Sequence, residues 1–292
     1  MAFGQLLGLL AGSVWLVAAP APSAFHFVLL GDRTGEAQPG VYEQIWRQVA
    51  AEKPAFVVSV GDTIQGGYDA TAAQEWQEVD AIVAPYRTIP LYLTPGNHDI
   101  WFTAGSGVRS AKTSPISEEL FRKHAGHPPH YSFDYGPIHF TILDNSRSED
   151  LSTEEMGFLR QDLEQHASQP VKFIVSHRPS WLVNAGLGNP AFPLHQLAKQ
   201  YGVQYVIAGH LHQMIHADLD GVIYVCLPSA GGHLRLSGEY EDGWFFGYTS
   251  VDVRGTHLEF KVHEIQGRVT NWNDWGLAGL SGARPHTASQ TH

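Results

Sequence analysis

The chain is poor in cysteine and in basic side chains. Its 292 residues include one cysteine, Cys226, so no disulfide can form within the chain and cysteine gives no indication of compartment. Lys and Arg number 18 against 29 Asp and Glu, a formal net charge of -11. Nucleic acid backbone and anionic membranes both require a basic face, so this balance argues against either as a sequence-independent partner. A phosphorylated ligand would have to be held by metal or by a few arginines.

Long apolar runs are also missing. The run Leu6–Ala19 is too short to span a bilayer comfortably, and small residues follow it up to Ala24. We therefore predict a signal peptide over 1–24, cleaved after Ala21 or Ala24, and a secreted or periplasmic protein without stable membrane insertion. No Lys or Arg precedes the run, which leaves an uncleaved anchor as the alternative. No cysteine follows it, which excludes a lipoprotein anchor.

The remaining length and the 43% hydrophobic content suit one large α/β domain, which we predict over 25–267 with a C-terminal tail over 268–292. Short apolar strands alternate with helices in the first half, which is typical of parallel βαβ units. The second half is richer in β-hairpins, and 100–129 form a long insertion. Ligands of parallel sheets bind beyond the carboxyl ends of the strands.

Asp and His side chains stand just past five of the predicted strands, 25–30, 56–60, 89–93, 171–175 and 203–207. Their carboxylate, amide and imidazole groups are ligands of divalent metals or carriers of protons. A single such residue is as consistent with a turn as with a site, but five strand ends of the same kind indicate a common cause. The residues are Asp32, Asp62, the run Gly96-Asn97-His98-Asp99, His177, and the pair His210 and His212.

These motifs, in this order, resemble the calcineurin-like metallophosphoesterase family, which includes purple acid phosphatases and phosphodiesterases. The resemblance covers roughly Phe25–Glu264 and depends on all the motifs together, because each alone is weak. It implies a four-layer α/β/β/α sandwich of two mixed β-sheets. It also implies a hydrolase of phosphate monoesters or diesters that uses two divalent or trivalent ions, such as Mn, Fe or Zn, sharing a hydroxide.

The resemblance implies a role for each residue. Asp62 would bridge the two ions, with Asp32 and His212 at one ion and Asn97, His177 and His210 at the other. The two-residue spacing of His210 and His212 would point both side chains the same way in an extended backbone. His98 would protonate the leaving group, and Asp99 would orient its imidazole.

The first motif departs from the family pattern. Most members have a histidine two residues after the first Asp, where this chain has Thr34, and purple acid phosphatases have a tyrosine where this chain has Gln65. Thr34, Gln65, a water or a histidine from elsewhere would have to complete the first metal site. Arg33 is either a solvated loop charge or a phosphate clamp.

Two functions follow from this. The favoured one is a metallophosphoesterase acting on a small phosphorylated substrate, since an intact leaving-group acid has no use in a pure binder. The alternative is a metal-depleted relative that binds phosphate ligands without turnover. The substrate class, the metal and the oligomeric state are left open by the sequence. Four large aromatic residues favour loop packing over a base-stacking cradle: Trp101, Phe102, Trp181 and Trp244.

Overall fold

The computed structural model describes residues 24–102, 113–235 and 238–277. The segment predicted as a signal peptide, apart from Ala24, and the end of the predicted tail lie outside these ranges. Within them, no helix has the length and apolar character needed to cross a membrane.

Twelve strands form two six-stranded sheets, ordered β12-β11-β10-β1-β2-β3 and β4-β5-β6-β7-β9-β8. In the first sheet β1, β2 and β3 run parallel, and in the second β5, β6, β7 and β9 do. The outer strands add antiparallel hairpins. The strands are β1 Ala24–Leu30, β2 Val57–Ser59, β3 Leu91–Leu93, β4 Tyr131–Tyr135, β5 Ile138–Ile142, β6 Val171–Val175, β7 Tyr205–Ala208, β8 Ile215–Leu219, β9 Val222–Cys226, β10 Gly247–Arg254, β11 His257–Glu264 and β12 Val269–Thr270.

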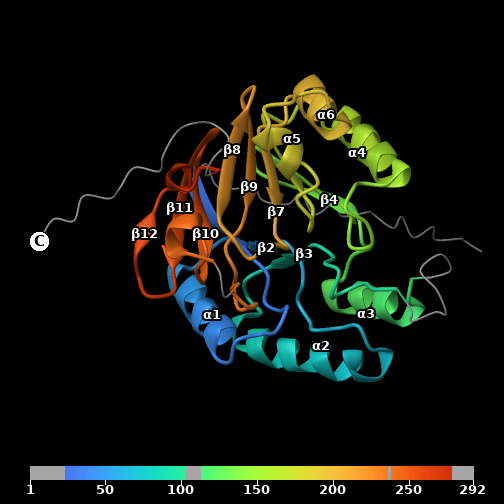
Figure 1. Ribbon diagram of the computed structural model, residues 1–292, viewed down its shortest axis with the longest axis vertical. Helices are drawn as coiled ribbons and strands as arrows, with labels where there is room; N and C mark the ends of the chain where they lie inside the picture. The colour runs from blue at the N-terminus through green and yellow to red at the C-terminus, as the bar shows by residue number, and fades with distance from the viewer. Residues whose placement is uncertain (1–23, 103–112, 236–237, 278–292) are drawn as a thin grey trace, which may run out of the picture.

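Helices cover the outer face of each sheet (Figure 1). Helix α1 lies against the first sheet with α2 and α3 beside it, while α4 and α6 lie against the second, at the opposite side of the molecule. The two mixed sheets with these helices confirm the predicted α/β/β/α sandwich. The helices are α1 Val41–Glu52, α2 Asp69–Val83, α3 Pro115–Ala125, α4 Thr153–Gln165, α5 Leu182–Gly186 and α6 Pro193–Tyr201, with short 3-10 turns at Ala84–Tyr86, Tyr240–Asp242 and Trp272–Asp274.

Strand β1 shows how the sequence builds these layers. Successive side chains of a strand point to opposite faces, so a strand between two apolar layers is apolar throughout. Phe27 faces the second sheet, where its ring packs edge-on against Phe140 and Phe173 at centroid distances of 5.4 and 5.8 Å. Val28 faces the other way, into the cluster that contains Trp46 of α1. Full burial of each large apolar side chain stabilises the fold by roughly 1.5–3 kcal/mol.

The chain after Gly267 begins as part of the fold. Strand β12 pairs with β11, and Trp272 and Trp275 are buried in the core between the sheets. The first part of the predicted tail thus packs against the core as far as Trp275, because two large aromatic side chains gain more by burial than polar ones would. Helix α5 was also not predicted, since its five residues show no clear apolar period.

Candidate metal centre

The carboxyl ends of the parallel strands of both sheets converge, and the predicted ligands lie in the loops that follow them. Ligand atoms of Asp62, His177 and His210 lie within 4.8 Å of one another. Those of Asp32, Asp62 and His212 form a second group of the same size. Asp62 belongs to both groups, the position that a bridging carboxylate requires.

Asn97 joins the first of these groups. Its Oδ1 lies 3.0 Å from Nε2 of His177, which is also 3.2 Å from Oδ2 of Asp62 and from Nδ1 of His210. The structure thus brings all six predicted ligands together, three or four side chains to each group.

Backbone turns, not an extended chain, aim three of these side chains. Asp62, His210 and His212 have φ angles of 52°, 70° and 59°, in the left-handed region that non-glycine residues seldom adopt. The expectation of an extended backbone between His210 and His212 is therefore wrong. Each still joins a different group, because each residue turns separately. Such conformations cost of order 1–3 kcal/mol each and cluster at functional sites.

Two glycines allow the loops to approach this closely. A Cβ on Gly96 would lie 2.2 Å from Oδ1 of Asp62, and one on Gly209 would lie 2.6 Å from Oδ2 of Asp32. Either contact is too short for a carbon atom. A larger residue at either position would displace a carboxylate of the centre.

Backbone carbonyls set the tautomers of two histidines. Nδ1 of His177 donates to the carbonyl of Val60 at 2.9 Å, and Nδ1 of His212 donates to that of His233 at 2.7 Å. A carbonyl can only accept, so Nδ1 carries the proton and Nε2 offers its lone pair to the centre in the neutral ring. Metal-binding histidines are oriented in this way.

Neighbouring charges and burial shift the pKa values of the residues in the centre. Burial lowers the pKa of His177, but the neighbouring Asp62 outweighs burial and raises that pKa to about 9. Burial raises the pKa of Asp62, which His177 and His98 nevertheless hold at about 2. Burial is the main cause of the raised pKa of Asp32 and of the lowered pKa of His210, about 3. Two buried carboxylates thus require positive charge beside them, and oxygen and imidazole donors suit divalent cations such as Mn, Fe and Zn. The donor set fits the implied metals.

Asp99 does not contact the ring of His98, contrary to prediction. Its Oδ1 accepts from the amides of Thr63 and Ile64 at 2.8 and 3.1 Å, and its Oδ2 accepts from the amide of Gly96 at 2.9 Å. Asp99 is buried in a tight turn, so its carboxylate is directed back at the loop amides, which it holds in place. The ring of His98 is fixed instead through Nδ1, 2.5 Å from the carbonyl of Gln65.

The two positions that depart from the family pattern contact each other. Oγ1 of Thr34 donates to Oε1 of Gln65 at 2.6 Å, and Thr34 is fully buried. The same Oε1 also accepts from the amide of Glu36 at 3.0 Å. Together these side chains form a neutral hydrogen-bonded pair on the loops that carry Asp32 and Asp62.

Asn145, which was not predicted, holds the loop of His177. It follows β5, and its Oδ1 accepts from the amides of His177 and Arg178 at 3.0 and 2.9 Å. Its Nδ2 donates to the carbonyl of Arg178 at 2.8 Å. The only signal in the sequence is its place just after a strand, since a single Asn after a strand is an ordinary turn residue.

Arg178 was also missed. Its Nη1 donates to Nε2 of His210 at 3.2 Å and to the carboxylate of Glu149. It lies next to His177 in the sequence, which was a signal available beforehand. Arg33, for which the sequence left a loop charge and a phosphate clamp open, donates to the carbonyl of Thr63 at 3.0 Å and lies 5.7 Å from the ring centre of Tyr42.

Two of the four aromatic residues are buried and two are not. Trp101 and Trp181 are buried, as loop packing requires, whereas Phe102 is exposed. Trp244 is half-buried and lies under the guanidinium of Arg235, 5.5 Å from its ring centre.

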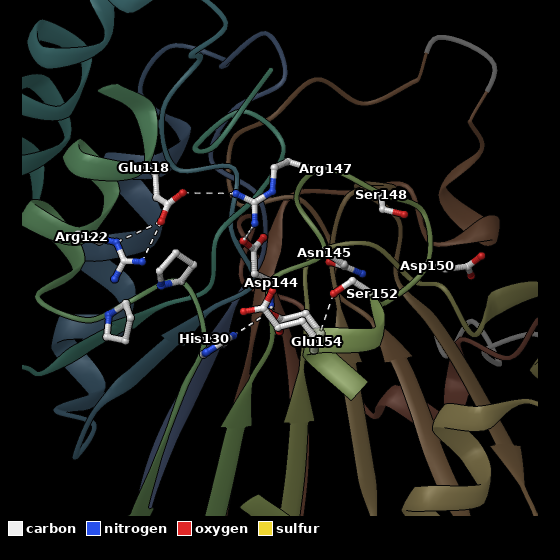
Figure 2. Close-up of a pocket in the computed structure, with 13 residues that line it drawn as sticks. Glu118, Arg122, His130, Asp144, Asn145, Arg147, Ser148, Asp150, Ser152 and Glu154 are labelled. Atoms are coloured by element: carbon white, nitrogen blue, oxygen red, sulfur yellow. Dashed lines mark hydrogen bonds and ion pairs between the residues drawn. The ribbon is translucent and has the colours of Figure 1, made fainter. Parts of the chain in front are cut away.

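A cavity of about 260 Å³ opens beside Asn145 (Figure 2). Ion pairs cross its wall: Arg147 contacts Asp144 and lies 3.7 Å from Glu118, which also pairs with Arg122 at 2.8 Å. None of the predicted ligands lines it. Asn145 therefore connects the cavity with the metal centre, because it lines the cavity while its side-chain amide hydrogen-bonds to the loop of His177.

Comparison with known proteins identifies the family. A family model described as calcineurin-like phosphoesterase matches residues 25–214. The chain belongs to this family of hydrolases, as the motifs predicted, and the family depends on two metal ions.

The chain is similar to several known proteins. The chain is 26% identical over 209 residues to the 3',5'-cyclic adenosine monophosphate phosphodiesterase CpdA of Escherichia coli K12, covering 70% of each chain. It is 25% identical over 170 residues to purple acid phosphatase 15 of Arabidopsis thaliana, covering 53% of this chain and 32% of the relative. The structure of purple acid phosphatase PPD1 from yellow lupin superposes with a TM-score of 0.64 at 19% identity, covering 87% of this chain and 54% of that one. The chain thus spans about a third of one phosphatase and half of the other.

Proposed function

We propose that this chain hydrolyses phosphate esters with two metal ions held at the candidate centre. The observation that carries the proposal is the overlap of two donor groups at Asp62. Asp32 and His212 would complete one ion site, and Asn97, His177 and His210 the other. Bound there, two ions would polarise the phosphoryl group and supply an activated water.

His98 is proposed as the group that protonates the departing oxygen. Its Nδ1 donates to the carbonyl of Gln65, so Nε2 of this half-buried ring has a proton to give to the departing oxygen when the ring is doubly protonated. Its backbone amide donates to Oδ1 of Asp62 at 2.9 Å, so the ring is anchored directly beside the shared carboxylate. Asp99 would act indirectly, by holding the loop amides around Asp62.

The test is metal analysis of the purified chain followed by parallel assays on a chromogenic monoester and diester. About two ions per chain and turnover of at least one ester would support the proposal. The matched control is Asp62→Asn, which keeps the size of the side chain but removes the shared charge. If the metal-loaded parent were as inert as this variant toward both esters, the hydrolase assignment would be wrong.

A second function is favoured by the pair of Thr34 and Gln65. In their place the family has a histidine or a tyrosine ligand, and here the two side chains satisfy each other at 2.6 Å. The group of Asp32, Asp62 and His212 then has one strong ligand fewer. We would then expect the chain to hold one ion and to bind phosphate ligands without hydrolysing them. Measurement of metal content together with phosphate binding separates the two functions.

Export is proposed on the sequence alone. The apolar run Leu6–Ala19 and the small residues after it should be removed after Ala21 or Ala24. Amino-terminal sequencing of protein from the native host decides this, since intact Met1 in a membrane fraction would indicate an anchor.

A further inference from the structure

We propose that Arg178 binds a terminal oxygen of the substrate phosphate and makes the site prefer monoesters to diesters. This inference rests on the proposed hydrolase function. It names a substrate class for that site and a residue that selects it.

The position of Arg178 supports this role. Asn145 hydrogen-bonds to its backbone amide and carbonyl. Its guanidinium contacts Nε2 of His210, the ring nitrogen opposite the one that faces His177. Within the described ranges, Nε of Arg178 is buried without a hydrogen-bond partner, and the hydrogen bonds of the guanidinium run through Nη1. A guanidinium has five N–H groups in a planar fork that matches phosphate oxygens. Donors therefore remain for a ligand.

A metal ion bound by His210 would disrupt the contact between Arg178 and His210. Arginine can only donate, so Nε2 of His210 must accept, and the ring then carries its proton on Nδ1. Nδ1 is the nitrogen that faces His177, at 3.2 Å. If Nδ1 gives its lone pair to an ion, the neutral ring keeps its proton on Nε2, and that nitrogen no longer accepts from Arg178. Loading of the centre would thus free the guanidinium beside it.

The remaining partner of Arg178 is weak. The side chain of Glu149 is 79% exposed, whereas that of Arg178 is 16% exposed. Exposed partners contribute about 0–1 kcal/mol, so a phosphate dianion can displace this carboxylate. With a net charge of -11, the chain relies on such local cations to hold an anionic substrate.

The number of phosphate oxygens gives the selectivity. A monoester has three terminal oxygens and up to two negative charges, whereas a diester has two such oxygens and one charge. Two ions would engage two of the oxygens. The third exists only in the monoester, and a guanidinium matches it best.

The experiment compares the metal-loaded parent with Arg178→Met, which keeps the apolar stem, and with Glu149→Gln as the matched control. Inorganic phosphate and dimethyl phosphate are titrated by calorimetry, and kcat/KM is measured for a nitrophenyl monoester and diester. Arg178→Met should lower the affinity for inorganic phosphate and the kcat/KM for the monoester about 10–100-fold, because it removes a hydrogen bond to a charged group. Dimethyl phosphate and the diester should change less than about threefold. Glu149→Gln should tighten inorganic phosphate by up to about fivefold.

Three results would overturn the inference: loss of metal in Arg178→Met, equal losses for monoester and diester, or unchanged binding of inorganic phosphate. The first would mean that Arg178 acts through His210. If the parent hydrolyses neither ester, the hydrolase proposal fails separately. The two titrations then test the role of Arg178 by themselves. Weaker binding of inorganic phosphate alone in Arg178→Met would support the role, and equally weakened or unchanged binding of both ligands would contradict it.

Discussion

Substitution of Asn145 by alanine should weaken metal binding although Asn145 is not a predicted ligand. The side chain is 2% exposed and makes three hydrogen bonds, two from the amides of His177 and Arg178 and one to the carbonyl of Arg178. Asn145→Ala removes all three and leaves the amides of His177 and Arg178 without partners, while the carbonyl of Arg178 still accepts from the amide of Ser180 at 2.9 Å. The loop that carries His177 then loses the hydrogen bonds that tie it to the segment after β5.

The size of the effect follows from these bonds. At about 1 kcal/mol for each hydrogen bond, the variant should lose about 3 kcal/mol of stability. For a domain of this size, that lowers Tm by about 6–12 °C. Supporting partners of ligands are typically worth 10–100-fold in metal affinity, so the ion held by His177 should bind that much more weakly.

Gln204 offers a matched control, because it holds the beginning of β6 as Asn145 holds the loop after the end of β6. Its Oε1 accepts from the amide of Lys172 at 2.8 Å, and its Nε2 donates to the carbonyl of Pro170 at 3.1 Å. Gln204→Ala should lower Tm by a few degrees and leave metal affinity unchanged. Titration of each apo-protein with Zn²⁺ or Mn²⁺, alongside thermal melts, makes the comparison. Parent-like metal affinity in Asn145→Ala, or an equal loss in Gln204→Ala, would refute the reasoning.

Three further predictions concern the ligands, the proposed acid and a buried histidine. Asp62→Ala should lose both ions because Asp62 belongs to both donor groups, whereas His212→Ala should empty only its own; elemental analysis decides, and two ions retained in Asp62→Ala would contradict a shared carboxylate. His98→Ala should keep its metal and lower kcat about 10²–10⁴-fold, with a smaller loss for nitrophenyl than for alkyl esters, and a loss of metal would instead make His98 a ligand. Burial lowers the pKa of His139, but hydrogen bonds to two carboxylates outweigh it and raise that pKa above its usual value. The stability from this group is therefore complete below about pH 6.5 and is lost as pH rises through the raised pKa. His139→Gln should cost about 3–5 kcal/mol at pH 6 and less at pH 9, which chemical denaturation at both values checks.

Much of the architecture was readable in the sequence because it depends on local patterns. The apolar runs that became β1, β2 and β6 are buried on both faces, and their short length, with a glycine after β1 and β2 and a proline before β6, distinguishes them from helices. The hairpin of β10 and β11 belongs to the hairpin-rich second half that the sequence predicts, and its turn at Arg254 and Gly255 is a local signal. Strand β12 escaped notice, because two residues carry no period and its pairing with β11 is a long-range contact.

Some features of the candidate site were likewise predictable from the sequence, and others were not. The sequence by itself determined which side chains stand at strand ends, since position after an apolar run is a local property. It also showed the departures at Thr34 and Gln65. It could not show that these two residues, 31 positions apart, hydrogen-bond to each other, or that Asp62 lies between two donor groups.

Only the tertiary structure decided how the site is supported. The contact of Asp99 with loop amides, the left-handed turns at His210 and His212, and the hold of Asn145 on His177 and Arg178 all depend on loops from different strands meeting at one edge. The reason is geometric: the residue type sets what a side chain can donate or accept, whereas the packing of the two sheets sets which partner it reaches.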